Sequence, residues 1–416
     1  MALGCEGLLT LTIKMRVSPE LSSHQKLLNL MRRYREGLNH AIRVVVESKA
    51  LSLGKAHKLL YNVLKERYNL PSKVAVDCYR EAIAIAKSWL SNPDRGRMPR
   101  AKTPRLWLTY KYSYRIRDGY VELLGGYKLR IVGWDRRYDG YSSGDARLML
   151  KDGKFVLEVS KHVPKPVKYN PRGVLAVDIN EKHVVFGNSR TEYKFETAIE
   201  RALHYKLLAE NLQKRYSSTR YNVWLRRRGV RERVGYFHKR TRNIVEDWVK
   251  KVSHKIVSLA KQHLYAIARE DLSGLVENLR KLPRKHRVAI LLLSYRRLEH
   301  WIDWQCEKNG VPLIVVDPKG TSSTCPRCNS KLVENGYRRM KCVKCSFEAD
   351  RDTIAVLNIE KKALSKMGGS LTTPTAPQMT DVSTNRCGEP MKPLKGTLTL
   401  QAGRRSAPFS IFQTFI

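Results

Sequence analysis

Four cysteines in two closely spaced pairs carry the clearest chemical signal in the sequence. Cys325 and Cys328 form the first pair, Cys342 and Cys345 form the second, and thirteen residues separate the pairs. Each pair can place two thiolates on one side of a turn, and two such turns complete the tetrahedral four-sulfur shell that zinc prefers. Two redox-active dithiols are the alternative, but two matched pairs suit a metal better. Because a closed four-sulfur shell leaves no open coordination position, we predict one structural zinc ion per chain.

Three acidic residues lie where strands or helices are expected to end or begin. Asp178 follows the apolar segment "GVLAV", Glu270 follows "HLYAIAR", and Asp352 precedes "TIAVLNI". One acid in such a place is more often a helix cap or a surface charge. Three that converge would repel one another unless a cation lay between them, and carboxylate oxygens suit Mg²⁺ or Mn²⁺. Two such ions about 4 Å apart could clamp a scissile phosphate, so the three acids are candidate catalytic metal ligands.

The register of the last expected helix distinguishes Asp352 from its neighbour Asp350. Residues that are three, four and seven positions apart lie on one face of a helix. Asp352 has this spacing to three apolar residues that should pack on a sheet, namely Ala355, Val356 and Ile359. Asp350 lies off that face and before the helix. The pattern therefore nominates Asp352 as the third acid.

The charge of the chain is the abnormal feature of its composition. The 416 residues include 79 Lys and Arg but 38 Asp and Glu, which gives a formal net charge of +41. A polyanion should neutralise this charge, with nucleic acid the first candidate and a membrane surface the second. The longest apolar run, residues 288–293, is far shorter than the roughly 20 residues that span a bilayer. The N-terminus lacks the basic region of a signal peptide, so we expect a cytoplasmic protein without a membrane partner.

One segment combines basic and aromatic residues in the way that nucleic-acid-binding surfaces do. Lys214 to Arg242 contains eleven Lys and Arg and one acid, with aromatic side chains between them. A solvated basic face is the alternative interpretation. We favour contact with a nucleic-acid backbone, because aromatic rings in such company can stack on unpaired bases. The candidate contact residues are Trp224, Arg226, Arg227, Arg228 and Arg231.

The hydrophobic pattern divides the chain into two parts that would position these residues. A strand at residues 8–17 precedes a basic helical region, and short alternating segments at 104–163 predict an antiparallel sheet or barrel. A Pro-rich linker follows at 163–173. Beyond it, apolar strands ending at Asp178 and Glu270 alternate with long helices. This alternation favours an α/β domain with a parallel or mixed sheet.

Five short motifs occur in order along the second part of the chain: "LAVDIN", "AIAREDL", "TSSTCPRC", "CVKC" and "DRDTIAVLNI". In this order they resemble the TnpB (OrfB) family of transposon-encoded nucleases, relatives of the type V CRISPR effectors. The resemblance covers nearly the whole chain and implies an RNA-guided DNA endonuclease, with a guide RNA and a target DNA as partners. It also implies that Asp178, Glu270 and Asp352 are the catalytic acids of a single RuvC-like site with two Mg²⁺ or Mn²⁺ ions.

The resemblance further implies an α+β multidomain architecture. An N-terminal β-barrel with an inserted helical lobe would precede a RuvC-like nuclease domain of ribonuclease H fold, which a zinc ribbon interrupts. The final residues are rich in Ser, Thr, Pro and Gly, as in disordered segments. The expected boundaries are 1–18 and 96–165 for the barrel, 19–95 for the helical lobe, 171–319 and 350–364 for the nuclease domain, 320–349 for the ribbon and 365–416 for a disordered tail.

Three positions depart from the family pattern. Asn180 and Ser346 stand where glycine is usual, and Ile354 stands where asparagine is usual. None of them removes a metal ligand, so activity is expected. The alternative is a catalytically weak or inactive zinc-ribbon regulator that binds nucleic acid, which would leave the three ordered acids as a coincidence. The sequence has no His-x-His pair, which excludes a single-strand transposase of the histidine type.

Overall fold

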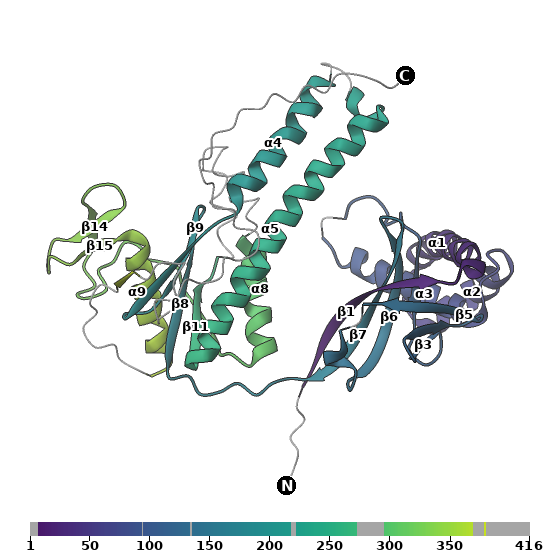
Figure 1. The fold of residues 1–416 in the computed structure, drawn as a ribbon, viewed down its shortest axis with the longest axis horizontal. Coiled ribbons are helices and arrows are strands. Elements are labelled where there is room, and N and C mark those ends of the chain that lie inside the picture. The colour runs from purple at the N-terminus through teal and green to yellow at the C-terminus, as the bar shows by residue number, and fades with distance from the viewer. Residues whose placement is uncertain are drawn as a thin grey trace, which may run out of the picture. The chain divides into compact units, whose positions relative to one another are not determined.

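The structure of the protein is a computed structural model that describes residues 7–93, 95–133, 135–217, 222–272 and 295–368, and the backbone of strand β16 (Gln378–Met379). The chain forms two compact units, Met1–Lys165 and Pro166–Ile416 (Figure 1). Residues 365 and 366, which were predicted to begin the disordered tail at 365–416, are helical in the structure. Apart from β16, the tail beyond residue 368 lies outside the described residues. Within those residues, no helix is both long enough and apolar enough to cross a membrane.

The N-terminal unit is built on a seven-stranded antiparallel sheet. Its strands are β1 (Leu8–Pro19), β2 (Arg105–Leu108), β3 (Tyr114–Arg117), β4 (Tyr120–Leu123), β5 (Tyr127–Val132), β6 (Ser142–Lys151) and β7 (Lys154–Pro164). In space they follow the order β2-β6-β7-β1-β5-β4-β3, so the N-terminal strand lies in the middle. A bridge between Tyr110 and Tyr114 brings the two edges together. The sheet is therefore nearly closed, which confirms the predicted barrel-like sheet.

Three helices are inserted between β1 and β2, namely α1 (Leu21–Glu47), α2 (Leu53–Glu66) and α3 (Ser72–Leu90). A short 3-10 turn, η1 (Arg136–Tyr138), lies later in the unit. Tyr34 and Leu38 of α1 are fully buried in the same core as Leu106 and Leu148 of the sheet. Because the helices bury their apolar faces with the strands, the helical insertion and the sheet share one hydrophobic core.

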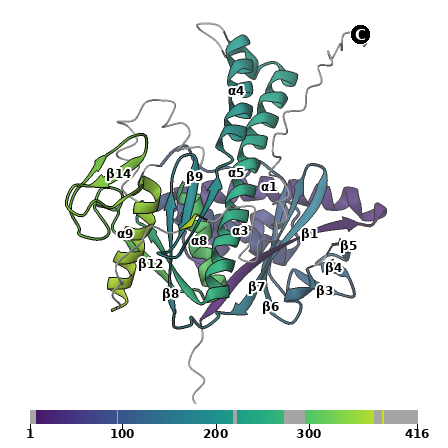
Figure 2. The ribbon, with the colours of Figure 1, turned by 60° about the vertical axis from the view of Figure 1, so that its left-hand side comes forward.

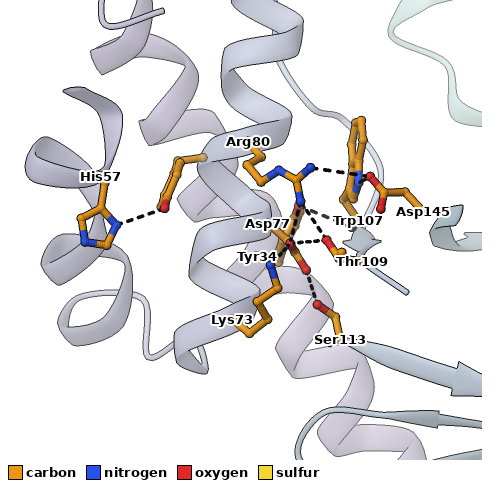
Figure 3. Close-up of polar contacts among 10 residues, drawn as sticks. Tyr34, His57, Lys73, Asp77, Arg80, Trp107, Thr109, Ser113 and Asp145 are labelled. Carbon is orange, nitrogen blue, oxygen red and sulfur yellow. Dashed lines mark hydrogen bonds and ion pairs between the residues drawn. The ribbon is translucent and has the colours of Figure 1, made fainter. Parts of the chain in front are cut away.

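A buried polar cluster attaches α3 to the segment between β2 and β3 (Figure 3). Asp77 on α3 is fully buried and accepts hydrogen bonds from Thr109 Oγ1, at 2.8 Å, and from Ser113 Oγ. Lys73 and Arg80, on neighbouring turns of the same helix, approach its carboxylate to 3.3 and 3.8 Å. A buried charge is tolerated only when it is paired and hydrogen-bonded, as here. The cluster therefore fixes the helical insertion against the sheet.

The C-terminal unit contains a mixed six-stranded sheet. In addition to β16, its strands are β8 (Gly173–Ile179), β9 (His183–Gly187), β10 (Thr191–Glu196), β11 (Tyr265–Glu270) and β12 (Leu313–Val316). Their order is β12-β11-β8-β9-β10-β16. The strand β11 pairs in parallel with β8 and β12, whereas β9 is antiparallel to β8 and β10. The mixed sheet expected from the sequence is present.

Helices cover both faces of this sheet (Figures 1 and 2). They are α4 (Ile199–Arg215), α5 (Arg228–His263), α8 (Tyr295–Asn309) and α9 (Arg351–Lys366). One core joins the sheet to α5 and α8, and a second core joins it to α9. The paired ends of α4 and α5 project beyond the sheet. The sheet is therefore the central layer of the unit.

A small three-stranded antiparallel sheet lies in the chain between β12 and α9. Its strands are β13 (Leu332–Glu334), β14 (Arg339–Cys342) and β15 (Glu348–Asp350). It carries the segment with the two cysteine pairs. Because β15 ends at Asp350 and α9 begins at Arg351, the small sheet leads directly into the helix that carries Asp352.

Candidate metal centres and nucleic-acid interface

The four cysteine sulfurs form a compact cluster in which all ligand atoms lie within 4.8 Å of one another. The Sγ atoms of Cys325 and Cys345 are 3.5 Å apart, and those of Cys328 and Cys342 are 3.4 Å apart. A tetrahedral site with Zn–S bonds of about 2.3 Å separates its sulfurs by about 3.8 Å. The cluster could therefore hold a zinc ion with little movement. Hydrogen bonds from Ser330 lower the pKa of the Cys328 thiol to about 6, whereas burial raises that of Cys325 to about 12. Cys328 is therefore the thiol of the two that more readily forms the thiolate that a metal binds.

The two cysteine pairs adopt the same turn. Asn329 N donates to Cys325 O at 2.9 Å, and Ser346 N donates to Cys342 O at 3.0 Å. Asn329 and Ser346 both have left-handed backbones, with φ of 60° and 55°. Asparagine tolerates this region better than serine does, and glycine tolerates it best. This turn explains why a glycine is expected at position 346, and the serine there strains the turn without removing a ligand.

Strand alternation directs Asp178 and Glu270 to one side of the large sheet. Successive side chains on a strand point to opposite faces. Asp178 is two residues after Ala176 on β8, and Glu270 is two residues after Ala268 on β11; both alanines pack in the core with α9. Asp352 lies in the first turn of α9, which covers that same face. The structure therefore brings the three predicted acids to one side of the sheet.

Two of these carboxyl groups are buried, and Asp178 feels the charge of the other two acids. Asp178 and Asp352 are only 7% and 3% exposed. Burial, and then the negative charges of Glu270 and Asp352, raise the pKa of Asp178 to about 8. Burial also raises the pKa of Glu270. A cation between the carboxylates would relieve this repulsion.

Three further side chains, which the acid pattern did not nominate, contact these carboxylates. Asn180 Nδ2 donates to Asp178 Oδ2 at 2.6 Å and to Asp352 Oδ1 at 3.1 Å. The guanidinium of Arg338, from the turn between β13 and β14, forms an ion pair with Asp352 Oδ1. His183 Nε2 lies 3.3 Å from Asp352 Oδ2 without the geometry of a hydrogen bond, and burial lowers its pKa. No sequence pattern marks Arg338 or His183, because each is far in sequence from the acids it meets.

The neighbouring aspartate has a structural role. Asp350 is the N-cap of α9, and its Oδ1 accepts a hydrogen bond from Asp352 N at 2.8 Å. A capping carboxylate satisfies one of the free N–H groups at the start of a helix. Asp350 thus orients the first turn of α9, while Asp352 points toward the sheet side with the other acids.

Helix α9 also connects the acids to the cysteine cluster. Ile354 is fully buried in a core with Cys325, Cys342 and Phe347. Asn358 Nδ2 donates to the backbone oxygens of the segment before the first cysteine pair, at Thr321 and Thr324, both at 2.7 Å. The isoleucine that departs from the family pattern therefore packs the cysteine cluster against the helix. A change in the cluster should displace α9 and with it Asp352.

The two candidate metal sites differ in how closely their ligands are gathered. Within the described part of the chain, the cysteines are the one group of three or more potential ligands close enough to hold an ion as they stand. The three acids share a face, but Asn180 engages Asp178 and Asp352, and Arg338 engages Asp352. Their hard oxygen donors fit Mg²⁺ or Mn²⁺, and their mutual repulsion favours a cation.

The predicted basic contact residues lie where α4 and α5 meet at their projecting ends. Trp224 is half-buried in a 3-10 turn, η2 (Val223–Leu225), and Arg226, Arg227, Arg228 and Arg231 are exposed. The Arg227 guanidinium lies 5.2 Å from the ring centre of Tyr216. Arg228 forms an exposed ion pair with Glu232, at 2.9 Å. The segment Lys214–Arg242 therefore brings cations and aromatic rings together at the projecting ends of α4 and α5. Its residues 218–221 lie outside the described ranges.

Comparison with known proteins finds similarity to a Cas12f1-like domain, to a TnpB-like protein and to a transposase. A family model described as "Cas12f1-like, TNB domain" matches residues 295–359, which include α8, the cysteine cluster and the start of α9. The TnpB-like protein MJ0751 of Methanocaldococcus jannaschii is 27% identical over 225 residues, which are 52% of this chain and 77% of that protein. A second protein of that organism, described as a candidate transposase (MJ0856.1), is 34% identical over 79 residues, or 17% of this chain and 72% of that protein.

A solved structure shares the fold. The cryo-EM structure of a Cas12f1–sgRNA–target DNA complex contains a chain that superposes on this one with a TM-score of 0.53 and 11% identity. The match covers 85% of this chain and 99% of that chain. Because neither unit alone makes up 85% of the chain, the match extends into both units.

Proposed function

Because the chain belongs to the TnpB family, whose members are related to the type V CRISPR effectors, we propose that it is an RNA-guided DNA endonuclease encoded by a transposon and active in the cytoplasm. Its partners are a guide RNA and a target DNA, as in the Cas12f1 complex. The observation that carries the proposal is the convergence of Asp178, Glu270 and Asp352 on one face of the mixed sheet. The α/β unit is then a RuvC-like nuclease domain of ribonuclease H fold.

The acids would hold two Mg²⁺ or Mn²⁺ ions, which when bound polarise the scissile phosphate and activate a water molecule. The protein's own residues supply the rest. Asp178 and Glu270 present their carboxylates from two adjacent parallel strands, and Asp352 presents its carboxylate from the helix above them. Because these elements are fixed by buried cores, the carboxylates are preorganised for a charged substrate.

Arg338 has a role on the substrate side of this site. Its guanidinium already lies against Asp352, so it can donate hydrogen bonds to a phosphate oxygen brought to the acids. The cysteine cluster holds a structural zinc ion as a ribbon, and the ribbon places Arg338 and α9. His183 is neutral at neutral pH, because burial lowers its pKa, and it shields one side of Asp352.

The nucleic acids are held by the basic surface, which includes the tip formed by Trp224, Arg226, Arg227, Arg228 and Arg231. The exposure of these arginines leaves their charges available for phosphates. A +41 chain supplies the affinity for two polyanions, RNA and DNA.

Co-purifying RNA provides the direct test. The protein is purified from cells that express it with its flanking DNA, and the bound RNA is sequenced. A plasmid library that carries a match to that RNA, beside a randomised flanking sequence, is then incubated with the complex in Mg²⁺. Cleavage of a subset with a common flanking motif is expected. Guided binding without cleavage would favour the inactive regulator, and the absence of a specific RNA would overturn both the guide and the endonuclease.

A further inference from the structure

The turn between β8 and β9 places an amide between two of the acids. Asn180 Nδ2 lies 2.6 Å from Asp178 Oδ2 and 3.1 Å from Asp352 Oδ1. The backbone of the turn is closed by a hydrogen bond from Asn180 N to His183 O, at 2.9 Å. The short side chain on this fixed backbone therefore links a strand to a helix that lies 172 residues further along the chain.

We propose that Asn180 is a positioning residue that bridges the carboxylates of Asp178 and Asp352 and competes with the divalent cation for them. The inference rests on the proposed function, because it concerns the cation of that site. Its consequence is that Asn180 sets the cation concentration at which the site is filled, and holds the two acids in place until then.

The chemistry of the groups supports competition. Carboxylates accept hydrogen bonds, so the NH₂ end of the amide faces both of them. That nitrogen carries no lone pair for a metal, and it contacts the facing oxygens of the two acids. A cation that bridges these oxygens must displace the amide, and the displacement breaks two hydrogen bonds to charged acceptors.

Burial makes the two hydrogen bonds of Asn180 difficult to replace. The two aspartates are almost inaccessible to water, so water cannot replace the amide as a donor without some rearrangement. Arg338 donates to Asp352 Oδ1, the oxygen that Asn180 also contacts. The donor to Asp178 is Asn180. Removal of the amide therefore leaves Asp178 without this donor beside Asp352, in the place that a bridging cation would take.

The experiment measures Mn²⁺ binding to the full, zinc-loaded chain by electron paramagnetic resonance and by calorimetry. The variants are Asn180→Ala, Asn180→Gly and Asp178→Ala. The matched control is Asn309→Ala, which removes an amide that bonds Gln305 at the end of α8, on the opposite face of the sheet. Melting temperatures are measured with and without Mn²⁺.

We expect the Asn180 variants to bind Mn²⁺ about tenfold more tightly than the wild type, because binding no longer breaks the two hydrogen bonds. Without Mn²⁺ they should melt at a lower temperature than the wild type, and Mn²⁺ should raise their melting temperature by more. Asn309→Ala should keep the wild-type Mn²⁺ affinity. The Mg²⁺ concentration for half-maximal cleavage should fall in parallel.

Unchanged Mn²⁺ affinity in both Asn180 variants would overturn the competition, and weaker binding would overturn it too, because Asn180 would then favour the bound cation. In either case the proposed function would survive, provided that Asp178→Ala abolishes the binding. If the wild type binds no Mn²⁺, or if Asp178→Ala binds it as tightly as the wild type, the metal site itself is overturned, and the inference with it. The glycine variant keeps the test valid if the alanine variant does not fold.

Discussion

Arg338 and Asp352 form an ion pair between the turn of the small sheet and the first turn of α9. The backbone joins the same two segments, because Arg351 N donates to Arg338 O at 2.9 Å. Arg338 adopts a left-handed backbone, with φ of 61°. The small sheet that carries the cysteine cluster therefore contributes a side chain to the acidic site.

Replacing Arg338 by Gln should lower the cleavage rate by about a hundredfold, because a preorganised donor beside the developing charge is lost. Affinity for guide RNA and target DNA should stay close to that of the wild type. Cleavage and binding are measured together. The control is Arg339→Gln, which removes the adjacent exposed cation that pairs with Glu348 at 3.2 Å. Equal loss of cleavage in both variants would assign the effect to the general charge of the ribbon.

Replacing Asp178, Glu270 or Asp352 by Ala should abolish cleavage and leave nucleic-acid binding nearly intact, since the proposed nucleic-acid surface consists of other, basic residues. Asp350→Ala is the matched control. It removes the N-cap of α9 and should cost about 1 kcal/mol of stability while cleavage persists. Cleavage and melting temperature are measured for all four variants in Mg²⁺. Persistent cleavage in Asp352→Ala, with loss in Asp350→Ala, would show that the wrong aspartate was assigned.

Replacing Cys325 or Cys342 by Ser should release the zinc ion and reduce cleavage, because Ile354 packs α9 against these cysteines. Elemental analysis of the purified protein measures the metal. The wild type should contain one zinc per chain. Cys306→Ser is the control, since this cysteine is also buried but lies on α8, away from the cluster. Folded, active protein that contains no zinc would refute the structural metal.

A buried glutamate predicts how stability depends on pH. Glu360 on α9 accepts a hydrogen bond from Ser189 N at 2.6 Å, and burial raises its pKa from 4.5 to about 7. Between these values the folded protein holds a proton that the unfolded chain has released. The free energy of unfolding therefore falls as the pH rises from about 5 to 7, by on the order of 3 kcal/mol for this group.

Glu360→Gln should remove this part of the pH dependence and raise stability at pH 8, because the amide oxygen can still accept from Ser189. Urea unfolding at pH 5 and pH 8 provides the measurement. Glu334→Gln, at an exposed position on β13, should leave the dependence unchanged. A pH dependence in Glu360→Gln equal to that of the wild type would contradict the assignment.

Replacing Arg226, Arg227 and Arg228 together by Gln should weaken nucleic-acid binding and reduce the slope of log Kd against log salt by about two to three. Each phosphate contact that is lost lowers the slope by somewhat less than one. Replacing the same three residues by Lys keeps the charge and should keep most of the slope. Binding is measured between low and physiological salt. A wild-type slope in the Gln variant would mean that the three arginines form a solvated face.

The sequence by itself determined the features that depend on local spacing. The cysteine spacing predicted the cluster, because two residues between cysteines place both thiols on one turn. The helical period separated Asp352 from Asp350 and predicted the helical region after the first strand, where α1, α2 and α3 lie. Alternating segments predicted an antiparallel sheet or barrel, and continuous apolar segments predicted a parallel or mixed sheet, because strand periodicity follows from burial on one face or two.

Only the tertiary structure decided which side chains surround the acids. Asn180 and Arg338 reach Asp352 from segments that are 172 and 14 residues away, and both contacts depend on how α9 lies on the sheet and the small sheet on α9. Such contacts leave no periodic trace, since a hydrogen bond between distant segments constrains one residue on each side. The sequence therefore named the acids, and the packing of α9 decided what they meet.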